Sequence, residues 1–192
     1  MSHFPVFIDF ADKNILIVGG GSVATRKLAT LQMFGSCITV ISPMITDELA
    51  ELSSKYSGIK LVDRVACADD ICNDYDFCFI TSDDHDLNHK LAEKARKLKI
   101  PVNTADDPDY CDFYFPAVVN RGNIVVGIGT NGTLPALASE LRKKIEVMLP
   151  ETIVPELEEL ALMRKNLITS GKKPLEDLHF MSMLDDLMSR IK

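Results

Sequence analysis

The stretch that decides the fold is NILIVGGGSVATRKLATLQMF, residues 14–34. Residues 14–18 (NILIV) form a short, almost uninterrupted apolar run, which is typical of a strand buried on both faces. Three glycines follow this run, and Gly35 ends the segment. Between the three glycines and Gly35, apolar residues recur at helical spacings: Val23, Leu28, Leu31 and Phe34. The stretch therefore predicts a strand, a glycine turn and a helix in direct succession.

The glycine turn contains a nucleotide-binding pattern. Gly19, Gly21 and Ala24 match the G-x-G-x-x-G/A fingerprint, in which the residues permit a tight turn, a close approach to a pyrophosphate and close helix–strand packing, respectively. The helix N-terminus adds N–H donors and a positive dipole for the phosphates. The alternative is a purely structural turn. Because the motif stands between an expected strand and an expected helix, we favour a dinucleotide site.

The same alternation continues outward from this stretch. Further apolar runs predict strands at residues 37–42, 59–62, 77–81 and 100–103, and amphipathic segments predict helices at residues 46–56 and 84–98. Strands that alternate with helices of this length form a parallel sheet covered on both faces. We therefore expect an α/β, Rossmann-like domain over residues 1–112.

The alternation of strands and helices ends after residue 112. Two β-rich runs, residues 113–119 and 123–129, flank the turn-like Asn120-Arg121-Gly122 and suggest a hairpin. Helical patterns then cover most of the remaining chain. We expect a small hairpin and helix region at residues 113–149 and a helical C-terminal domain at residues 150–192.

Composition excludes several classes of protein. The 192 residues carry a net charge of −7, which argues against a general nucleic-acid binder because such proteins neutralise phosphates with clustered cations. No apolar run approaches the roughly 20 residues of a membrane-spanning helix, and the N-terminus lacks the pattern of a secretory signal. We expect a cytoplasmic protein without nucleic-acid or membrane partners.

Cysteine and histidine offer no resident metal site. The five cysteines form no CxxC pair, and we expect them to be buried free thiols: Cys37, Cys67, Cys72, Cys78 and Cys111. His85 and His89 share a helix face at i, i+4. They could form a metal pair, but no HExxH frame surrounds them, so we favour a hydrated surface pair.

The expected second strand does not settle which dinucleotide binds. An Asp or Glu near its end would hold the ribose of NAD, but Ser42, Pro43 and Met44 occupy that place, and no Arg is there to hold a 2′-phosphate. NAD and NADP therefore remain alternatives. Thr81, at the carboxyl end of the fourth strand, is a further candidate contact. The neighbouring Ser82 or Asp83 could instead simply cap the next helix.

The segment VNTADDP, residues 102–108, places two carboxylates at the same edge of the sheet. Asp106 and Asp107 follow the last strand of the domain, near the place expected for a nicotinamide. Asp107-Pro108-Asp109 is also good turn chemistry, so a structural turn and a catalytic base are both compatible with the local sequence. Like-charge repulsion from Asp107 would raise the proton affinity of Asp106.

Longer stretches resemble a known family. FPVFIDFADKNILIVGGGSVATRKLATL near the start and VNTADDPDYCDFYFPAVVNRGNIVVGIGTNGTLPALASELRKKIE in the middle are similar to the precorrin-2 dehydrogenase/sirohydrochlorin ferrochelatase family, the dehydrogenase part of siroheme synthase. The similarity covers about residues 3–150. It implies NAD-dependent oxidation of precorrin-2 to sirohydrochlorin, and in some members insertion of ferrous iron to give siroheme.

The resemblance also implies site residues and a partner. The N-x-x-D motif of the family puts the catalytic carboxylate on Asp106, and residues 113–149 correspond to a region of homodimerisation. The expected cofactor contacts are Gly19, Gly20, Gly21, Ser22, Val23, Ala24, Pro43, Met44 and Thr81. The expected substrate contacts are Asn103, Arg121, Thr130, Asn131 and Gly132. Further basic candidates, for each of which a solvated face is the favoured alternative, are Arg142, Lys143, Lys144 and, in the tail, Lys172 and Lys173. The alternatives are a chelatase without the oxidation step and a non-catalytic NAD- or tetrapyrrole-binding protein.

Overall fold

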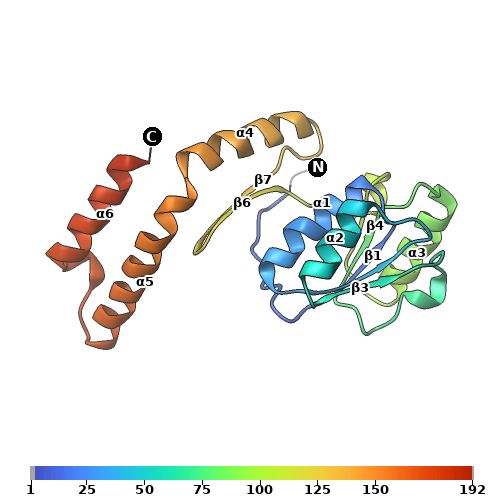
Figure 1. Cartoon of the computed structure of the whole chain (residues 1–192), viewed down its shortest axis with the longest axis horizontal. Helices are drawn as coiled ribbons and strands as arrows, with labels where there is room; N and C mark the ends of the chain where they lie inside the picture. Colours follow the sequence, from blue (N-terminus) through green and yellow to red (C-terminus); the bar gives the residue numbers. More distant parts are fainter. Residues whose placement is uncertain (1–2, 192) are drawn as a thin grey trace. The chain divides into compact units, whose positions relative to one another are not determined.

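The structure, a computed structural model, describes residues 3–191 and divides into two compact units (Figure 1). The first unit comprises Val6–Phe115 and contains the nucleotide-binding pattern. The second comprises residues 3–5 together with residues 116–191. Short 3-10 helices interrupt the loops of both units: Gln32–Phe34, Ala68–Asp70, Pro108–Tyr110, Glu151–Ile153 and Pro174–Glu176.

A five-stranded parallel sheet forms the centre of the first unit. Its strands lie in the order β3-β2-β1-β4-β5, so the direction of winding reverses between β1 and β4. In sheets of this kind, ligands bind outside the carboxyl ends of the strands at that reversal. The expected Rossmann-like fold is confirmed, with strands β1 (Asn14–Val18), β2 (Cys37–Ile41), β3 (Ile59–Val62), β4 (Phe77–Ile80) and β5 (Val102–Thr104).

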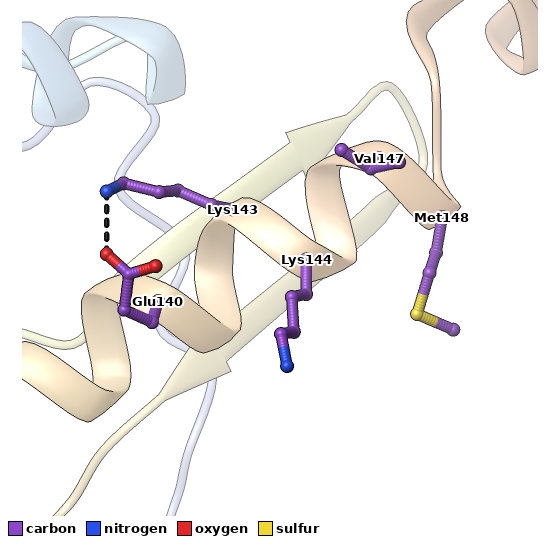
Figure 2. A pocket seen from close by; sticks show the side chains of 5 residues that line it. All are labelled: Glu140, Lys143, Lys144, Val147 and Met148. Atoms are coloured by element: carbon purple, nitrogen blue, oxygen red, sulfur yellow. Dashed lines mark hydrogen bonds and ion pairs between the residues drawn. The ribbon is translucent and has the colours of Figure 1, made fainter.

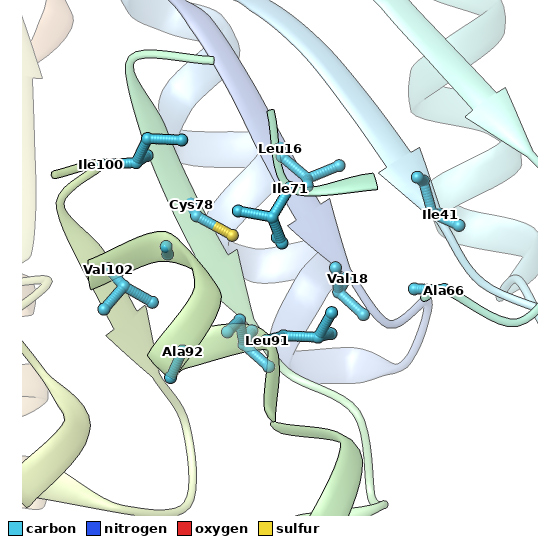
Figure 3. Close-up of a cluster of buried hydrophobic side chains, with 12 residues drawn as sticks. Leu16, Val18, Ile41, Ala66, Ile71, Cys78, Leu91, Ala92, Ile100 and Val102 are labelled. Atoms are coloured by element: carbon cyan, nitrogen blue, oxygen red, sulfur yellow. The ribbon is translucent and has the colours of Figure 1, made fainter. Parts of the chain in front are cut away.

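Helices cover both faces of this sheet. α1 (Ser22–Leu31) and α2 (Asp47–Lys55) lie side by side over one face, and α3 (His85–Lys97) covers the other (Figure 1). Side chains of β1 alternate between the two layers, with Leu16 in the cluster under α3 (Figure 3) and Ile17 in the cluster under α1. This two-sided burial explains the uninterrupted apolar run, since each fully buried side chain contributes about 1.5–3 kcal/mol.

Several expected boundaries in the first unit are shifted, two of them by two residues or more. The helix expected through residue 34 leaves the α conformation after Leu31 and tightens into a 3-10 turn that ends at Gly35, whose φ is 76°. The last strand begins at Val102 instead of residue 100, because the N–H of Ile100 still donates to the carbonyl of Ala95 in α3.

The second unit begins with an antiparallel hairpin, β6 (Ala117–Arg121) and β7 (Ile124–Ile128). The expected strand from residue 113 is wrong at its start, because Phe113 and Phe115 pack edge-on against Phe79 in the core of the first unit. Three helices follow the hairpin: α4 (Pro135–Met148), α5 (Val154–Thr169) and α6 (Leu178–Arg190). They share a small core of Leu149, Ile153, Leu160, Leu167, Phe180 and Leu187.

The cysteines are all free, as expected, but they are not all buried. Cys78 lies in the core, where burial raises the pKa of its thiol to about 12. Cys37 and Cys67 are exposed, because they occupy the start of a strand and a loop. Within residues 3–191, no helix is both long enough and apolar enough to cross a membrane.

Candidate functional site

The glycine loop joins β1 to α1 at the reversal point of the sheet. Gly19 has a φ of 104°, and a Cβ there would lie 2.8 Å from the backbone of Thr81. A Cβ on Gly20 would clash with the carbonyl oxygen of Met44. At Gly21, by contrast, an added Cβ would meet no described atom within 4 Å beyond its chain neighbours. The first two glycines are therefore sterically required, whereas the third leaves open space above the loop.

Backbone hydrogen bonds hold this loop in place. The N–H of Gly19 donates to the carbonyl of Ile41 at 3.0 Å, and the N–H of Thr46 donates to the carbonyl of Gly20 at 3.1 Å. Gly21 is the N-cap of α1, and no described side chain caps that terminus. The first N–H groups of a helix have no partner inside it, so they are available to an anion. The loop thus fits the pyrophosphate of a dinucleotide.

The other expected cofactor residues near this loop fall into an exposed group and a buried group. Some are exposed or half-buried beside it: Ser22, Val23, Pro43 and Met44. Ala24 is buried in the core under α1, and Thr81 is buried with its hydroxyl donating to the carbonyl of Val18 at 2.8 Å. These two residues support the loop from below, since neither side chain faces the open space above Gly21.

Asp106 lies at the carboxyl edge of the same sheet, directly after β5. Asn88 of α3 is fully buried and donates through its side-chain amide to Asp106 Oδ2 at 3.0 Å and to the carbonyl of Ser82 at 2.8 Å. The hydroxyl of Ser82 donates to Asn88 Oδ1 at 2.5 Å, which orients the amide with its nitrogen towards Asp106. His85 Nδ1 lies 2.5 Å from the same Asp106 Oδ2. Three side chains thus form one network around the carboxylate.

This network sets the charge of Asp106. Burial alone would raise the pKa of this carboxyl group, but the hydrogen bonds from Asn88 and His85 outweigh it and hold the pKa below its ordinary value. The expected increase through like-charge repulsion is therefore wrong in direction. Asp106 Oδ1 is buried and has no hydrogen-bond partner among residues 3–191. One oxygen is held by the protein, and the other is left as an unused acceptor.

Asp107 has a separate, structural set of contacts. Its Oδ1 accepts from the N–H of Asp109 at 2.9 Å and caps the turn Pro108–Tyr110. Its Oδ2 lies 3.2 Å from Nε2 of His89, whose ring stacks on Tyr110 at 4.4 Å. The two adjacent carboxylates therefore differ in role, because Asp107 stabilises the turn that presents Asp106.

The histidine pair was only partly understood from sequence, since both side chains reach solvent as expected but each also has a protein partner. Instead of a merely hydrated pair, His85 and His89 each contact one carboxylate of the loop after β5. The sequence did contain a signal for these contacts. Two histidines lie four residues apart on one helix, and two adjacent carboxylates follow the next strand. Within the described chain, no group of three or more His, Cys, Asp or Glu side chains is arranged to hold a metal ion.

Asn103 ties β5 to α1. Its Oδ1 accepts from Nζ of Lys27 at 2.8 Å, and its Nδ2 donates to the carbonyl of Phe113 at 2.9 Å. The Lys27 ammonium lies over the rings of Phe79 and Phe115, and burial lowers its pKa to about 8. Both ends of the Asn103 amide thus serve internal contacts, and the residue is buried instead of facing a ligand.

The remaining expected substrate residues lie in the second unit. Arg121 donates to the carbonyls of Leu149 and Asn120 at 2.7 and 2.8 Å. In the loop before α4, the hydroxyl of Thr130 accepts from the N–H of Leu134, and Asn131 Oδ1 lies 3.0 Å from His3 Nδ1. Asn131 and Gly132 both have positive φ, and an added Cβ at Gly132 would meet no described atom within 4 Å.

Most of the candidate cations on α4 are paired along the helix. Lys143 contacts Glu140 at 2.7 Å, and Arg142 contacts Glu146 at 2.5 Å. Lys144 has no ion pair with any described residue. It lines a hollow of about 440 Å³ together with Glu140, Lys143, Val147 and Met148. In Figure 2 its side chain points away from the Lys143–Glu140 pair.

Comparison with known proteins finds similar chains. A siroheme synthase of Psychrobacter cryohalolentis is 40% identical over 151 residues, which cover 79% of this chain and 28% of that protein. A siroheme synthase of Methylococcus capsulatus is 35% identical over 180 residues, which cover 94% of this chain and 38% of that protein. The resemblance to siroheme synthase inferred from sequence is confirmed, although the chain spans only about a third of the length of these relatives.

A solved structure shares the fold. The structure described as SirC, precorrin-2 dehydrogenase, superposes with a TM-score of 0.69 and covers 97% of this chain and 100% of its own, at 21% identity. A family model described as putative NAD(P)-binding matches residues 6–117, the unit that contains the glycine loop and Asp106. The chain therefore belongs to this putative NAD(P)-binding family.

Proposed function

We propose that this chain oxidises precorrin-2 to sirohydrochlorin, with NAD as the hydride acceptor. The observation that carries the proposal is the position of the Asp106 carboxylate, whose pKa is held below its ordinary value by hydrogen bonds, at the same sheet edge as the open glycine loop. The names of the relatives support the substrate, since they are siroheme synthases and the structure that shares the fold is called a precorrin-2 dehydrogenase.

The chain's own residues have defined tasks in this reaction. The N–H groups at the start of α1 and the space above Gly21 receive the pyrophosphate. Bound NAD supplies the hydride acceptor. Oxidation removes one hydride and one proton from the macrocycle, and Asp106 accepts the proton because its carboxyl group is ionised near neutral pH. Asn88 holds the carboxylate in position for that transfer.

The proposed specificity for NAD rests on the resemblance to the family, and the end of β2 is compatible with it. Ser42 donates its hydroxyl to the carbonyl of Met44 at 2.6 Å, and no cation stands among residues 42–44 to meet a 2′-phosphate. For the substrate, the proposed contacts are Arg121 and the loop of Thr130, Asn131 and Gly132. Asn103 contributes by fixing the strand that leads to Asp106.

A homodimer is part of the proposal. Exposed apolar side chains gather on α4 and in the loop before it, and they support a contact surface there: Leu134, Leu137, Leu141, Val147 and Met148. Ferrochelation of sirohydrochlorin and a cytoplasmic location stay predictions. In ferrochelation, ferrous iron would be a substrate and Asp106 would accept the pyrrole protons.

An anaerobic assay tests the proposal. Purified protein receives precorrin-2 with NAD or with NADP, and the formation of reduced nucleotide is followed by its absorbance. We expect turnover with NAD and much slower turnover with NADP. Ferrous ion is added afterwards, and conversion of sirohydrochlorin above the spontaneous rate would establish ferrochelation. Absence of nucleotide reduction with both cofactors would remove the dehydrogenase function.

A further inference from the structure

Every turnover of the proposed dehydrogenase leaves a proton on Asp106, and that proton must reach solvent before the next cycle. The present inference rests on the proposed function and concerns this exit. The side chain of Asp106 is only 14% exposed, and its Oδ1 is buried without a described partner. Direct loss of the proton to water from Oδ1 is therefore blocked in this structure.

The two partners of the other oxygen differ in their chemistry. Asn88 donates to Oδ2, but an amide nitrogen is not basic and does not take up a proton at neutral pH, and the side chain is fully buried. His85 contacts the same oxygen through Nδ1, and its side chain is 71% exposed. Imidazole can take a proton at one nitrogen and release one from the other. Among the described partners of Asp106, His85 alone joins the carboxyl group to solvent.

We propose that His85 is the proton relay that regenerates the Asp106 carboxylate. The transfer uses the tautomer of His85 that carries its hydrogen on Nε2: the proton on Oδ2 passes to Nδ1, which breaks the O–H bond, forms an N–H bond and leaves an imidazolium beside the restored carboxylate. Nε2 of the exposed imidazolium then releases its proton to water, and exchange with solvent returns the neutral ring to the Nε2–H tautomer for the next cycle. Charge and atoms balance, and no further reactant is consumed. Asn88 keeps the carboxylate aligned with the ring throughout.

The surroundings leave His85 free for this task. It is the first residue of α3, and the carboxylate of Asp84 is already engaged as the cap of that helix, accepting from the N–H of Leu87 at 3.0 Å. Across residues 3–191, Asp106 is the one carboxylate that makes a hydrogen bond with His85. The relay is therefore specific to one acid.

The chain provides a matched control in His89. This residue lies one turn further along the same helix and contacts a carboxylate too, but its partner Asp107 caps a turn and its ring is stacked on Tyr110. A substitution of His89 changes a histidine–carboxylate pair of the same kind without touching Asp106. The comparison of the two variants separates a relay from general loss of an ion pair.

The experiment compares His85→Gln and His89→Gln in the anaerobic assay. Rates are measured in a dilute buffer without imidazole and again with increasing imidazole, a small proton carrier. We expect kcat of His85→Gln to fall about 10²-fold in the dilute buffer and to recover as imidazole rises, at the lower end of general acid–base effects. The kcat of His89→Gln should equal that of the wild-type protein and should not change with imidazole. Unchanged unfolding temperatures would show that both variants fold.

Two results would overturn the relay. One is a wild-type rate for His85→Gln in dilute buffer, and the other is a reduced rate that imidazole does not restore, which would assign His85 a positioning role only. In both cases the wild-type protein still turns over, so the proposed function stands. Failure of the wild-type protein itself to reduce NAD is a different result, and it would remove the function on which the relay rests.

Discussion

Asn88 controls the charge of Asp106 from a fully buried position. Only one orientation of its amide satisfies all its contacts. The Ser82 hydroxyl donates to the amide oxygen, and the backbone carbonyl of Ser82 accepts a hydrogen bond from the amide nitrogen. The remaining N–H of the amide can then only donate to Asp106. A donor fixed in this way stabilises the ionised carboxylate and lowers its pKa.

This arrangement predicts the effect of Asn88→Asp. The variant replaces a donor with a second carboxyl group beside Asp106, so the pKa of Asp106 should rise. Since the base works only when it is ionised, the acid limb of the pH profile of kcat/KM should move by about one unit or more towards higher pH. The folded state should also lose about 1–3 kcal/mol, because buried groups lose their partners.

A milder variant serves as the control for this prediction. Ser82→Ala removes the hydroxyl that orients the amide but leaves Asn88 in place. Its acid limb should move in the same direction by a smaller amount. If the acid limbs of the wild-type protein and of both variants superimpose, Asn88 does not set the charge of Asp106.

The candidate site was only partly predictable at this scale. The place of Asp106 followed from sequence, since the carboxyl ends of parallel strands share one edge and the strand before it was expected. Its contacts with Asn88 and His85 did not, because they depend on the rotation of α3 against β5. Local sequence also could not show that hydrogen bonds would outweigh burial at Asp106.

At the scale of the elements, the glycine loop makes two neighbouring residues behave differently. Gly20→Ala places a Cβ against the carbonyl oxygen of Met44, a backbone atom that cannot easily move. Gly21→Ala places it in open space at an ordinary φ of −81°. The first substitution should affect folding, and the second should affect a ligand above the loop.

We therefore expect Gly20→Ala to lower the free energy of unfolding by an amount on the order of 2 kcal/mol, measured by urea denaturation. Gly21→Ala should unfold like the wild-type protein but bind NAD at least about tenfold more weakly by calorimetry, because the methyl group would occupy the approach to the pyrophosphate. Unchanged NAD affinity in Gly21→Ala would place the pyrophosphate elsewhere.

Most elements were predictable because their patterns are strong. The strand at residues 14–18 and the strand at residues 59–62 were expected with the bounds that the structure has. Errors fall where tertiary contacts override local pattern. Phe113 and Phe115 look like part of a strand, but they fill the core of the first unit beside Phe79, and β6 begins only at Ala117.

At the scale of the whole molecule, the apolar face of α4 predicts the oligomeric state. Val147 is 80% exposed, so Val147→Asp should change the stability of a single chain little. Light scattering should give twice the chain mass of 21.3 kDa for the wild-type protein and the mass of one chain for the variant. Leu178→Asp, an exposed apolar position on α6, is the control and should remain a dimer. A wild-type monomer would contradict the proposal.

The most direct test of the central claim compares Asp106→Asn with Asp107→Asn. Both variants remove one negative charge from adjacent positions, but only Asp106 is the proposed proton acceptor, while Asp107 caps a turn. With saturating precorrin-2 and NAD, the rate of nucleotide reduction should fall about 10²–10⁴-fold in Asp106→Asn, with NAD binding retained. Asp107→Asn should lose much less. Near-wild-type rates in both variants would contradict the assignment of Asp106 as the base.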